Sequence, residues 1–251
     1  MIVRKNNYAF SIMREAGKRL ASIFQEISKK LKEGITTQEL DLFIENKLQA
    51  SGLYSQCKGY GYPPFPGSAC ISINDVIVHG IPSSQKLKQG DLVKVDICAS
   101  YNGYCADMAR SYFVGEAPSD KANLLVAVAY KSLDAGIDRV RVGNRISDIS
   151  FAIQSTVEAQ GFGVVRDFAG HGIGKKMHED PEIVNFGAPD KGPIIEVGMA
   201  FALEPMITLG DYVVAMDDDK WTARTVDGSL AAHVEDTVIV TDNGSEIITR
   251  L

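Results

Sequence analysis

A helical pattern in the first half of the sequence recurs 109 residues later in the second half. One predicted helix lies between Gly34 and Gly52, and its counterpart lies between Gly143 and Gly161. Each carries three apolar residues at intervals of four, which places them on one face of an amphipathic helix. They are Leu40, Ile44 and Leu48 in the first half, and Ile149, Ile153 and Val157 in the second. The recurrence indicates an internal duplication, although identity between the halves is slight and chance recurrence remains the alternative.

Another predicted helix precedes each of these, a long one at about residues 8–32 and a second near residues 123–134. Thr36 and Glu39 have the spacing of a capping box for the first of the two recurring helices. Strand-like stretches follow each helix pair: residues 70–73, 92–100 and 104–114, then 163–168, 199–208, a stretch near Trp221, 232–241 and 246–249. The sequence therefore predicts a single α/β (α+β) domain. Its two similar halves, about 1–115 and 116–251, would share a central antiparallel sheet flanked by helices.

The composition is that of an ordinary globular protein, with 45% hydrophobic and 23% charged residues among 251. A net charge of −6 argues against a surface built mainly to bind nucleic-acid phosphates. We expect no secretory signal and no membrane span, because no sufficiently long apolar run occurs. The four cysteines lack CxxC spacing and are scattered, which favours a reducing cytoplasm over a disulfide scaffold or a zinc knuckle.

Two aspartates lie on one predicted hairpin. Asn102-Gly103 is a strong two-residue turn signal, and pairing outward from it sets Asp96 opposite Ala109 and Asp107 opposite Cys98. Asp96 and Asp107 are then diagonal neighbours on one face, roughly 7–8 Å apart at the backbone. Two carboxylates with apolar flanks would repel each other unless a cation neutralised them. The alternative is a pair of ordinary aspartates on a solvated face.

Three of the four histidines have unusual neighbours. His171 lies in a Gly-His-Gly-Ile-Gly stretch, where the backbone can approach a ligand closely. His178 precedes an acidic pair, and His79 precedes a glycine. A structural role remains open for each of them. His233 lies two residues before Glu235, on the same strand face, and the sequence assigns it no role.

Two glutamates, Glu204 and Glu235, are single carboxylates within apolar strands, where an ionised group is costly unless paired or metal-bound. Asp236 is expected on the opposite, exposed face. The full set of candidate metal ligands is Asp96, Asp107, His171, Glu204 and Glu235. Such oxygen-rich sets suit Mn, Fe, Co or Mg, and imidazole also suits Zn. Asp217, Asp218 and Asp219 are better explained as a solvated turn than as a further metal site.

The order of these five residues resembles the ligand set of the type I methionine aminopeptidases. The stretches CISINDVIVHGIP, GDLVKVDI, FAGHGIGKKMHEDPEI and FALEPMI carry the same resemblance, which extends over essentially the whole chain. It implies the two-fold "pita-bread" fold in the short bacterial or organellar form. It also implies a hydrolase that removes N-terminal methionine from nascent polypeptides when the second residue is small.

Carried over by position, the resemblance implies two divalent cations (Co, Mn, Fe, Zn or Ni). Asp107 and Glu235 would bridge them, Asp96 would complete one site, and His171 with Glu204 the other. Activated water would attack the scissile carbonyl, with Glu204 as proton shuttle. His178 would stabilise the tetrahedral intermediate and His79 would contact the substrate near the scissile amide. The implied substrate-binding residues are His79, Cys57, Tyr60, Tyr62, Cys70, Phe168, Met177, His178 and Trp221.

Two departures from the family pattern affect the pocket. Met177 stands where an aromatic residue is usual, and the loop at residues 61–68 differs in length, which makes the alignment of Tyr60 and Tyr62 less secure. A proline-specific aminopeptidase of the same fold usually carries an extra N-terminal domain, for which we expect no room here. A non-enzymatic interaction module would be expected to lose ligands. The remaining expectations are a cytoplasmic monomer, and transient ribosome contact through Lys29, Lys30 and Lys32 if these do not simply form a solvated helix face.

Overall fold

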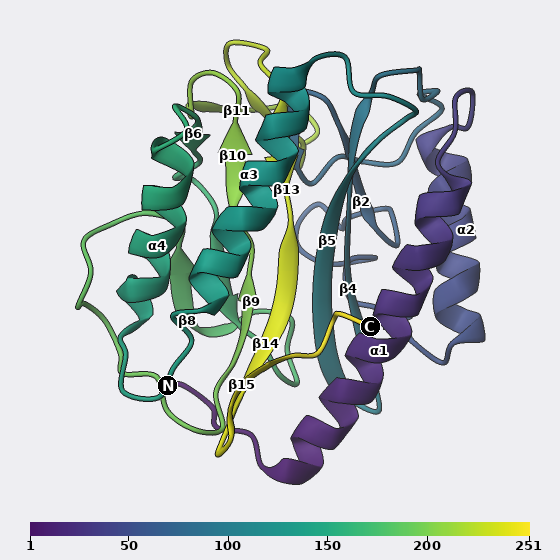
Figure 1. Cartoon of the computed structure of the whole chain (residues 1–251). Coiled ribbons are helices and arrows are strands. Elements are labelled where there is room, and N and C mark those ends of the chain that lie inside the picture. Colours follow the sequence, from purple (N-terminus) through teal and green to yellow (C-terminus); the bar gives the residue numbers. More distant parts are fainter.

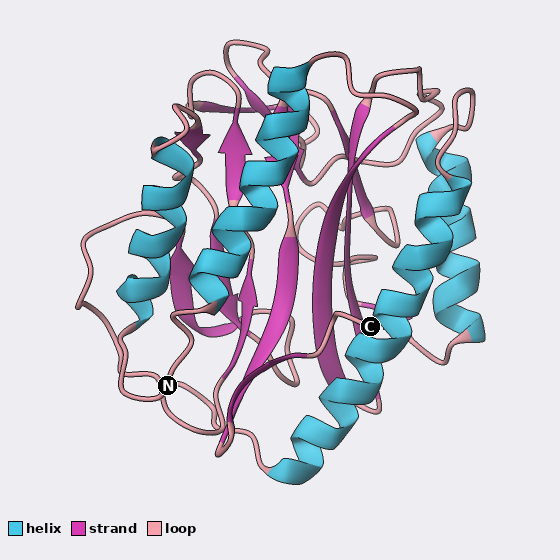
Figure 2. Ribbon diagram, viewed as in Figure 1, coloured by secondary structure: helices cyan, strands magenta, loops and turns pink.

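The computed structural model describes residues 1–251, with four helices in two pairs. They are α1 (Asn7–Lys30), α2 (Thr37–Ala50), α3 (Asp120–Ile137) and α4 (Ile146–Glu158). The α1–α2 pair covers one part of a curved sheet and the α3–α4 pair covers the other (Figures 1 and 2). No helix has the combination of length and hydropathy that a bilayer-spanning segment needs.

The second helix of each pair begins in the same local way. Glu39 accepts the backbone N–H of Thr36 in a complete capping box, as predicted, and Asp148 accepts the backbone N–H of Arg145. Helix α2 starts at Thr37 and α4 at Ile146, so the offset of 109 residues is kept. The glycine that precedes each helix has a positive φ, 87° at Gly34 and 95° at Gly143. Glycine adopts this conformation without a Cβ clash.

A nine-stranded antiparallel sheet forms the centre of the molecule. Its main order is β1-β4-β5-β14-β9-β7-β8, with β2 paired to β4 and β15 paired to β14. The strands are β1 (Tyr54–Ser55), β2 (Cys70–Ile73), β4 (Leu92–Tyr101), β5 (Tyr104–Phe113), β7 (Ala169–Gly172), β8 (Glu179–Val184), β9 (Ala200–Leu203), β14 (Glu235–Thr241) and β15 (Gly244–Ile247). The predicted α/β architecture with a shared antiparallel sheet is confirmed.

Two small sheets extend this centre. One has the order β13-β10-β6 and the other β11-β12-β3. Their strands are β3 (Val76–Val78), β6 (Gly163–Val164), β10 (Met206–Thr208), β11 (Val214–Met216), β12 (Ala223–Thr225) and β13 (Ala231–His233).

Three predicted strands are interrupted where the chain passes between sheets. The stretch 199–208 breaks at Glu204-Pro205, because proline has no N–H for a ladder hydrogen bond. The stretch 232–241 breaks at Val234, so that β13 pairs with β10 while β14 pairs with β5 and β9. The stretch 163–168 shortens to β6. The interruptions matter for function because candidate ligands lie at or next to two of them.

The buried core divides between the two helix pairs. A cluster of 33 buried residues includes the apolar faces of α1 and α2, and a cluster of 23 includes those of α3 and α4. The residues that recur in the sequence lie in these clusters: Leu40, Ile44, Leu48, Ile149, Ile153 and Val157. Burying each such side chain contributes roughly 1.5–3 kcal/mol to stability.

Gly17 on α1 provides a test of how closely the helix approaches the C-terminal segment. A Cβ added there would lie 2.2 Å from the carbonyl oxygen of Ile248. Alanine normally stabilises a helix interior by about 1 kcal/mol relative to glycine. We expect Gly17→Ala instead to lower the urea concentration at the midpoint of unfolding, because overpacking costs about 1–3 kcal/mol. The exposed substitution Lys18→Ala is the control, and a raised midpoint for Gly17→Ala would contradict the close contact.

Candidate metal centre

The two aspartates lie on the hairpin as predicted. Asp96 pairs with Ala109 and Asp107 pairs with Cys98 across β4 and β5, which confirms the register. On the other side of β5, Glu235 pairs with the same Ala109. Because paired residues share a face of the sheet, the carboxylates of Asp96 and Glu235 flank the position above Ala109, next to Asp107.

Five consecutive strands of the sheet each bring one candidate ligand to this place. Asp96 is on β4, Asp107 on β5 and Glu235 on β14, while Glu204 directly follows β9 and His171 is on β7. His171 Nε2 lies 3.5 Å from Glu204 Oε1 and 3.9 Å from Asp107 Oδ2. Three potential ligand atoms lie within 4.8 Å of one another, one from each of Asp107, His171 and Glu235.

Burial and mutual repulsion shape the chemistry of these groups. Burial, followed by neighbouring carboxylates, raises the pKa of Asp96, Glu204 and Glu235 well above the usual range. Burial raises the pKa of Asp107 to about 6 and lowers that of His171 to about 4. Four carboxylates, two of them buried and two partly buried, around a neutral imidazole are an unfavourable arrangement without a cation. Glu235 Oε1 also has no hydrogen-bond partner. The residues therefore fit a divalent metal centre.

His178 and His79 border this centre. The His178 ring stands edge-on to the His171 ring at 4.3 Å, and its Nδ1 lies 2.7 Å from the Tyr60 hydroxyl. The His79 ring packs edge-on against Phe168 at 5.2 Å. His79 has a φ of 59°, a strained conformation for a residue with a Cβ. Both histidines are thus held beside the carboxylates by aromatic contacts.

A cavity of about 110 Å³ joins the carboxylates to a wall of thiols and aromatic rings. It is lined by Cys57, Tyr60, Phe65, Cys70, His79, Asp96, Cys98, Asp107, His171, Met177, His178, Glu204, Trp221 and Glu235. A hydrogen bond to Cys57 and burial raise the pKa of Cys70 well above its usual range, so this thiol stays neutral. A neutral wall of this composition suits an apolar, polarizable side chain. A larger cleft of about 900 Å³ also reaches His171 and His178.

The comparisons with known proteins agree with this geometry. The family model of metallopeptidase family M24 matches residues 11–242. The chain belongs to metallopeptidase family M24. It is 46% identical over 250 residues to a protein of Clostridium acetobutylicum named methionine aminopeptidase, with 99% of each chain covered. The crystal structure of methionine aminopeptidase from Thermotoga maritima superposes with a TM-score of 0.96, at 39% identity and with 100% of both chains covered.

Membership in M24 confirms two broader expectations: the protein is a hydrolase, and it depends on divalent metal ions. The predicted pita-bread fold is confirmed by the same structural match. Prolidase from Pyrococcus furiosus shares the fold with a TM-score of 0.80 at 20% identity, and the present chain covers 66% of that prolidase.

Two predicted substrate-binding residues of this M24 enzyme lie outside the cavity. Tyr62 is 96% exposed and does not line this cavity. The chain turns at Gly61, where the Trp221 ring packs so closely that a Cβ would lie 2.5 Å from it, and the indole N–H donates to the Pro63 carbonyl. The tryptophan thus occupies the inner side of this loop and Tyr62 faces outward. Phe168 lines the larger cleft and contacts His79.

The structure adds two residues to the lining that the sequence did not indicate. Cys98 faces the cavity because it pairs with Asp107, and the predicted hairpin register already contained that information. Phe65 packs edge-on against Trp221 at 5.3 Å. Its loop has no periodicity that distinguishes an inward from an outward side chain, so no sequence signal identified it.

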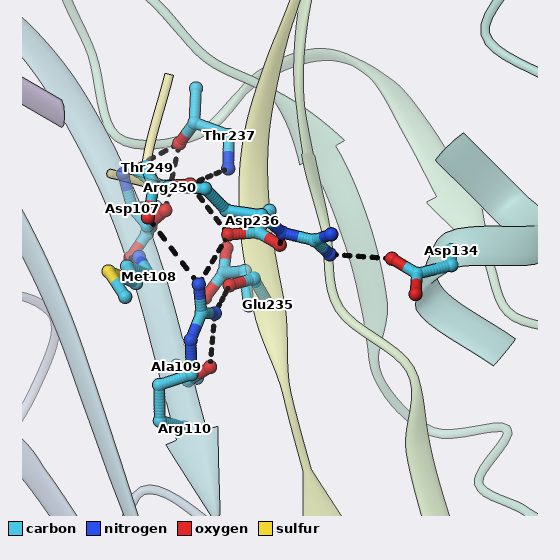
Figure 3. A network of polar contacts seen from close by, with 10 residues as sticks. All are labelled: Asp107, Met108, Ala109, Arg110, Asp134, Glu235, Asp236, Thr237, Thr249 and Arg250. Carbon is cyan, nitrogen blue, oxygen red and sulfur yellow. Dashed lines mark hydrogen bonds and ion pairs between the residues drawn. The ribbon is translucent and has the colours of Figure 1, made fainter. Parts of the chain in front are cut away.

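Asp236 is buried, which makes its predicted exposure wrong. Its side chain lies on the face of the sheet opposite the cavity, where Arg110, Arg250 and Thr249 bind it (Figure 3). Because side chains alternate along a strand, Asp236 points to the face opposite Glu235. Helices and the C-terminal segment cover that face, so Asp236 is buried there. Asp217 binds Arg224, and Asp219 accepts the backbone N–H of Trp221, within a turn.

His233 is fully enclosed beside the centre. Its Nε2 lies 3.7 Å from Glu204 Oε2, and neither ring nitrogen has a hydrogen-bond partner within the protein. Burial lowers the pKa of His233 to about 3, so the ring is neutral at neutral pH. The neutral ring adds no positive charge to offset the carboxylates.

Metal-free protein provides a test of the carboxylate repulsion. A carboxylate whose folded-state pKa is raised contributes stability below its ordinary pKa and loses it as pH rises through the raised value. Glu235→Gln removes one such group. We therefore expect the variant, with chelator present, to melt above wild type at about pH 7.5, with a smaller difference at about pH 5. Thermal melts of Glu235→Gln, with exposed Glu116→Gln as control, measure this; a pH-independent difference would contradict the repulsion.

Proposed function

We propose that this M24 enzyme is a methionine aminopeptidase that hydrolyses the N-terminal methionine from nascent polypeptides when the second residue is small. One observation carries the proposal: a five-residue carboxylate and imidazole set shares a single cavity with a wall of thiols and aromatic rings. Relatives named methionine aminopeptidase at 44–46% identity over nearly the full length support it.

Two divalent cations per chain are the proposed cofactors, drawn from Co, Mn, Fe, Zn or Ni. Asp107 and Glu235, on adjacent strands, would contact both cations; Asp96 would complete one site, and His171 with Glu204 the other. When bound, such a pair acts as a Lewis acid that polarises a carbonyl and lowers the pKa of water. The raised pKa values of the carboxylates support this assignment, since a cation favours their ionised forms.

The chain's own residues supply proton transfer and hydrogen bonding. We assign Glu204 to accept a proton from the attacking water and deliver it to the leaving amine, because its carboxylate lies at the cavity beside His171. His178 has a pKa lowered by burial and is neutral at neutral pH. If the Tyr60 hydroxyl donates to Nδ1, Nε2 carries the proton and can donate to the tetrahedral oxyanion. We assign His79 to contact the substrate near the scissile amide.

The methionine side chain is assigned to the thiol and aromatic wall. Methionine is long, unbranched and polarizable, and sulfur contacts aromatic rings favourably. The wall offers Cys57, Cys70, Tyr60, Phe65 and Trp221, together with the flexible Met177. The second residue of the peptide would pass close to the ligands and His79, which leaves little room for a large side chain.

A proline-specific peptidase is the alternative within the fold. Its support is a shared fold with prolidases and an Xaa-Pro dipeptidase at 19–24% identity. A non-enzymatic interaction module is a second alternative, but all five candidate ligands are present and gathered. Metal analysis combined with cleavage of methionine- and proline-containing peptides distinguishes these three functions.

We further propose a single catalytic domain formed by duplication, and a cytoplasmic monomer. The matched starts of α2 and α4 support the duplication, and four free cysteines support a reducing compartment. Nascent chain N-termini would be its partners. Lys29 and Lys30 lie in the last turn of α1 and remain the candidates for transient ribosome contact, together with Lys32.

The role of His178 leads to a kinetic prediction. His178→Ala should lower kcat by roughly 100- to 1000-fold, because it removes one donor to the transition state. Tyr60→Phe should have a smaller effect, since it leaves the imidazole in place. Steady-state kinetics with metal content measured on each variant check this. A change confined to KM would instead assign His178 to ground-state binding.

Substrate preference is the second prediction. Peptides that start with Met-Ala, Met-Gly or Met-Ser should be cleaved efficiently, and those that start with Met-Lys or Met-Leu poorly. Norleucine should be accepted in part, because one pocket contact discriminates by only about 1–3 kcal/mol. A peptide library varied at the first two positions tests this. Equal rates for first-position Leu, Phe and Met would instead indicate a general aminopeptidase.

A further inference from the structure

A buried ionic cluster lies directly behind the candidate metal centre. Its hub is Asp236, which follows Glu235 on β14 and has no exposed surface. Asp236 Oδ1 accepts hydrogen bonds from Arg110 at 2.7 Å and from the Thr249 hydroxyl at 2.8 Å, and Oδ2 accepts one from Arg250 at 2.7 Å. Figure 3 shows the two guanidinium groups converging on this carboxylate.

The cluster also holds the backbone of the two residues that we propose to bridge the metals. Arg110 donates to the carbonyl oxygen of Glu235. The Thr237 hydroxyl donates to the Asp107 carbonyl at 2.8 Å and accepts the Asp107 N–H at 2.8 Å. Thr249 joins these contacts, because its hydroxyl oxygen accepts the Thr237 N–H at 3.1 Å while it donates to Asp236.

The strand junction at this point is short. β5 and β14 are in register at only two residue pairs, Glu235 with Ala109 and Asp236 with Met108. Asp107 and Glu235 come one from each of these strands, so the distance between their carboxylates depends on this junction. With so few regular pairs, the side-chain contacts of Arg110 and Thr237 supply much of the connection.

Stability alone does not account for such a cluster. Bringing charged groups out of water costs about as much as their attraction returns, and well-packed apolar residues often serve stability equally well. Directional hydrogen bonds to the backbone, however, fix positions that apolar contacts leave less defined. Groups that orient metal ligands from behind typically change metal affinity about 10- to 100-fold when removed.

We propose that Asp236, held by Arg110, Thr249 and Arg250, is a positioning residue. It sets the separation of the Asp107 and Glu235 carboxylates, and through it the affinity of the centre for its second divalent cation. The inference rests on the proposed dinuclear function. Arg250 also reaches Asp134 on α3 at 2.7 Å, so the cluster links the strand junction to the helix layer.

The experiment titrates metal-free protein with Mn²⁺ by calorimetry and records the visible absorption of the Co²⁺ form, which reports ligand geometry. Asp236→Asn should bind the first cation nearly as wild type does and the second about 10-fold or more weakly, with an altered Co²⁺ spectrum. Thr249→Val, which keeps shape and removes only the hydroxyl, should show the same change to a smaller extent.

Two control variants separate positioning from general stability. Asp134→Asn removes only the outer ion pair with Arg250 and should leave both affinities unchanged. Thr36→Ala removes the α2 cap and lowers stability far from the cluster, again without changing metal binding.

Wild-type affinity for both cations in a folded Asp236→Asn variant would overturn the positioning role while leaving the proposed function intact. If Asp236→Asn does not fold, Thr249→Val decides: an unchanged second affinity overturns the proposal. Fewer than two cations bound by wild type would instead defeat the dinuclear assignment, and the positioning role with it.

Discussion

The repulsion among buried carboxylates is the constraint on which the rest of this structure depends. Four acidic side chains from four strands meet in one cavity, and burial raises the pKa of every one of them. A flexible scaffold would relieve this repulsion by separating the strands. An antiparallel sheet resists that separation, because each strand is hydrogen-bonded to its neighbours and packed against the helix pairs.

The opposite face of the sheet carries a separate ion cluster whose charges balance within the cluster. Arg110 and Arg250 surround Asp236 there, one residue along the strand from Glu235. The two faces of β14 thus differ sharply: one presents acidic groups to the cavity, and the other is a satisfied ion cluster. The interruption of β9 at Pro205 has a related effect, because it releases the backbone next to Glu204 from the ladder and lets this carboxylate turn toward His171.

The histidines and thiols around the carboxylates are uncharged at neutral pH. Burial lowers the pKa of His79, His171 and His233 and keeps them unprotonated at neutral pH. A hydrogen bond to Cys57 and burial raise the pKa of Cys70, and burial raises that of Cys98, so both thiols stay protonated. Net negative charge is therefore confined to the carboxylates, where a divalent cation is favoured. The wall formed by thiols and rings stays apolar, which is the condition for recognising an apolar side chain in the same small cavity.

The sequence by itself determined the helix pairs and the hairpin register, and it indicated Asp96, Asp107, Glu204 and Glu235 as candidate ligands; their gathering with His171 was implied by the family resemblance and appears only in the tertiary structure. The helix pairs, the register and the candidate carboxylates follow from local rules: apolar periodicity, the Asn102-Gly103 turn, and the cost of isolated carboxylates in apolar strands. Only the tertiary structure decided that Asp236 is buried, that Tyr62 faces solvent and that Phe65 lines the cavity. Alternation along a strand tells which residues share a face, but not what covers that face, because the covering elements come from distant parts of the chain.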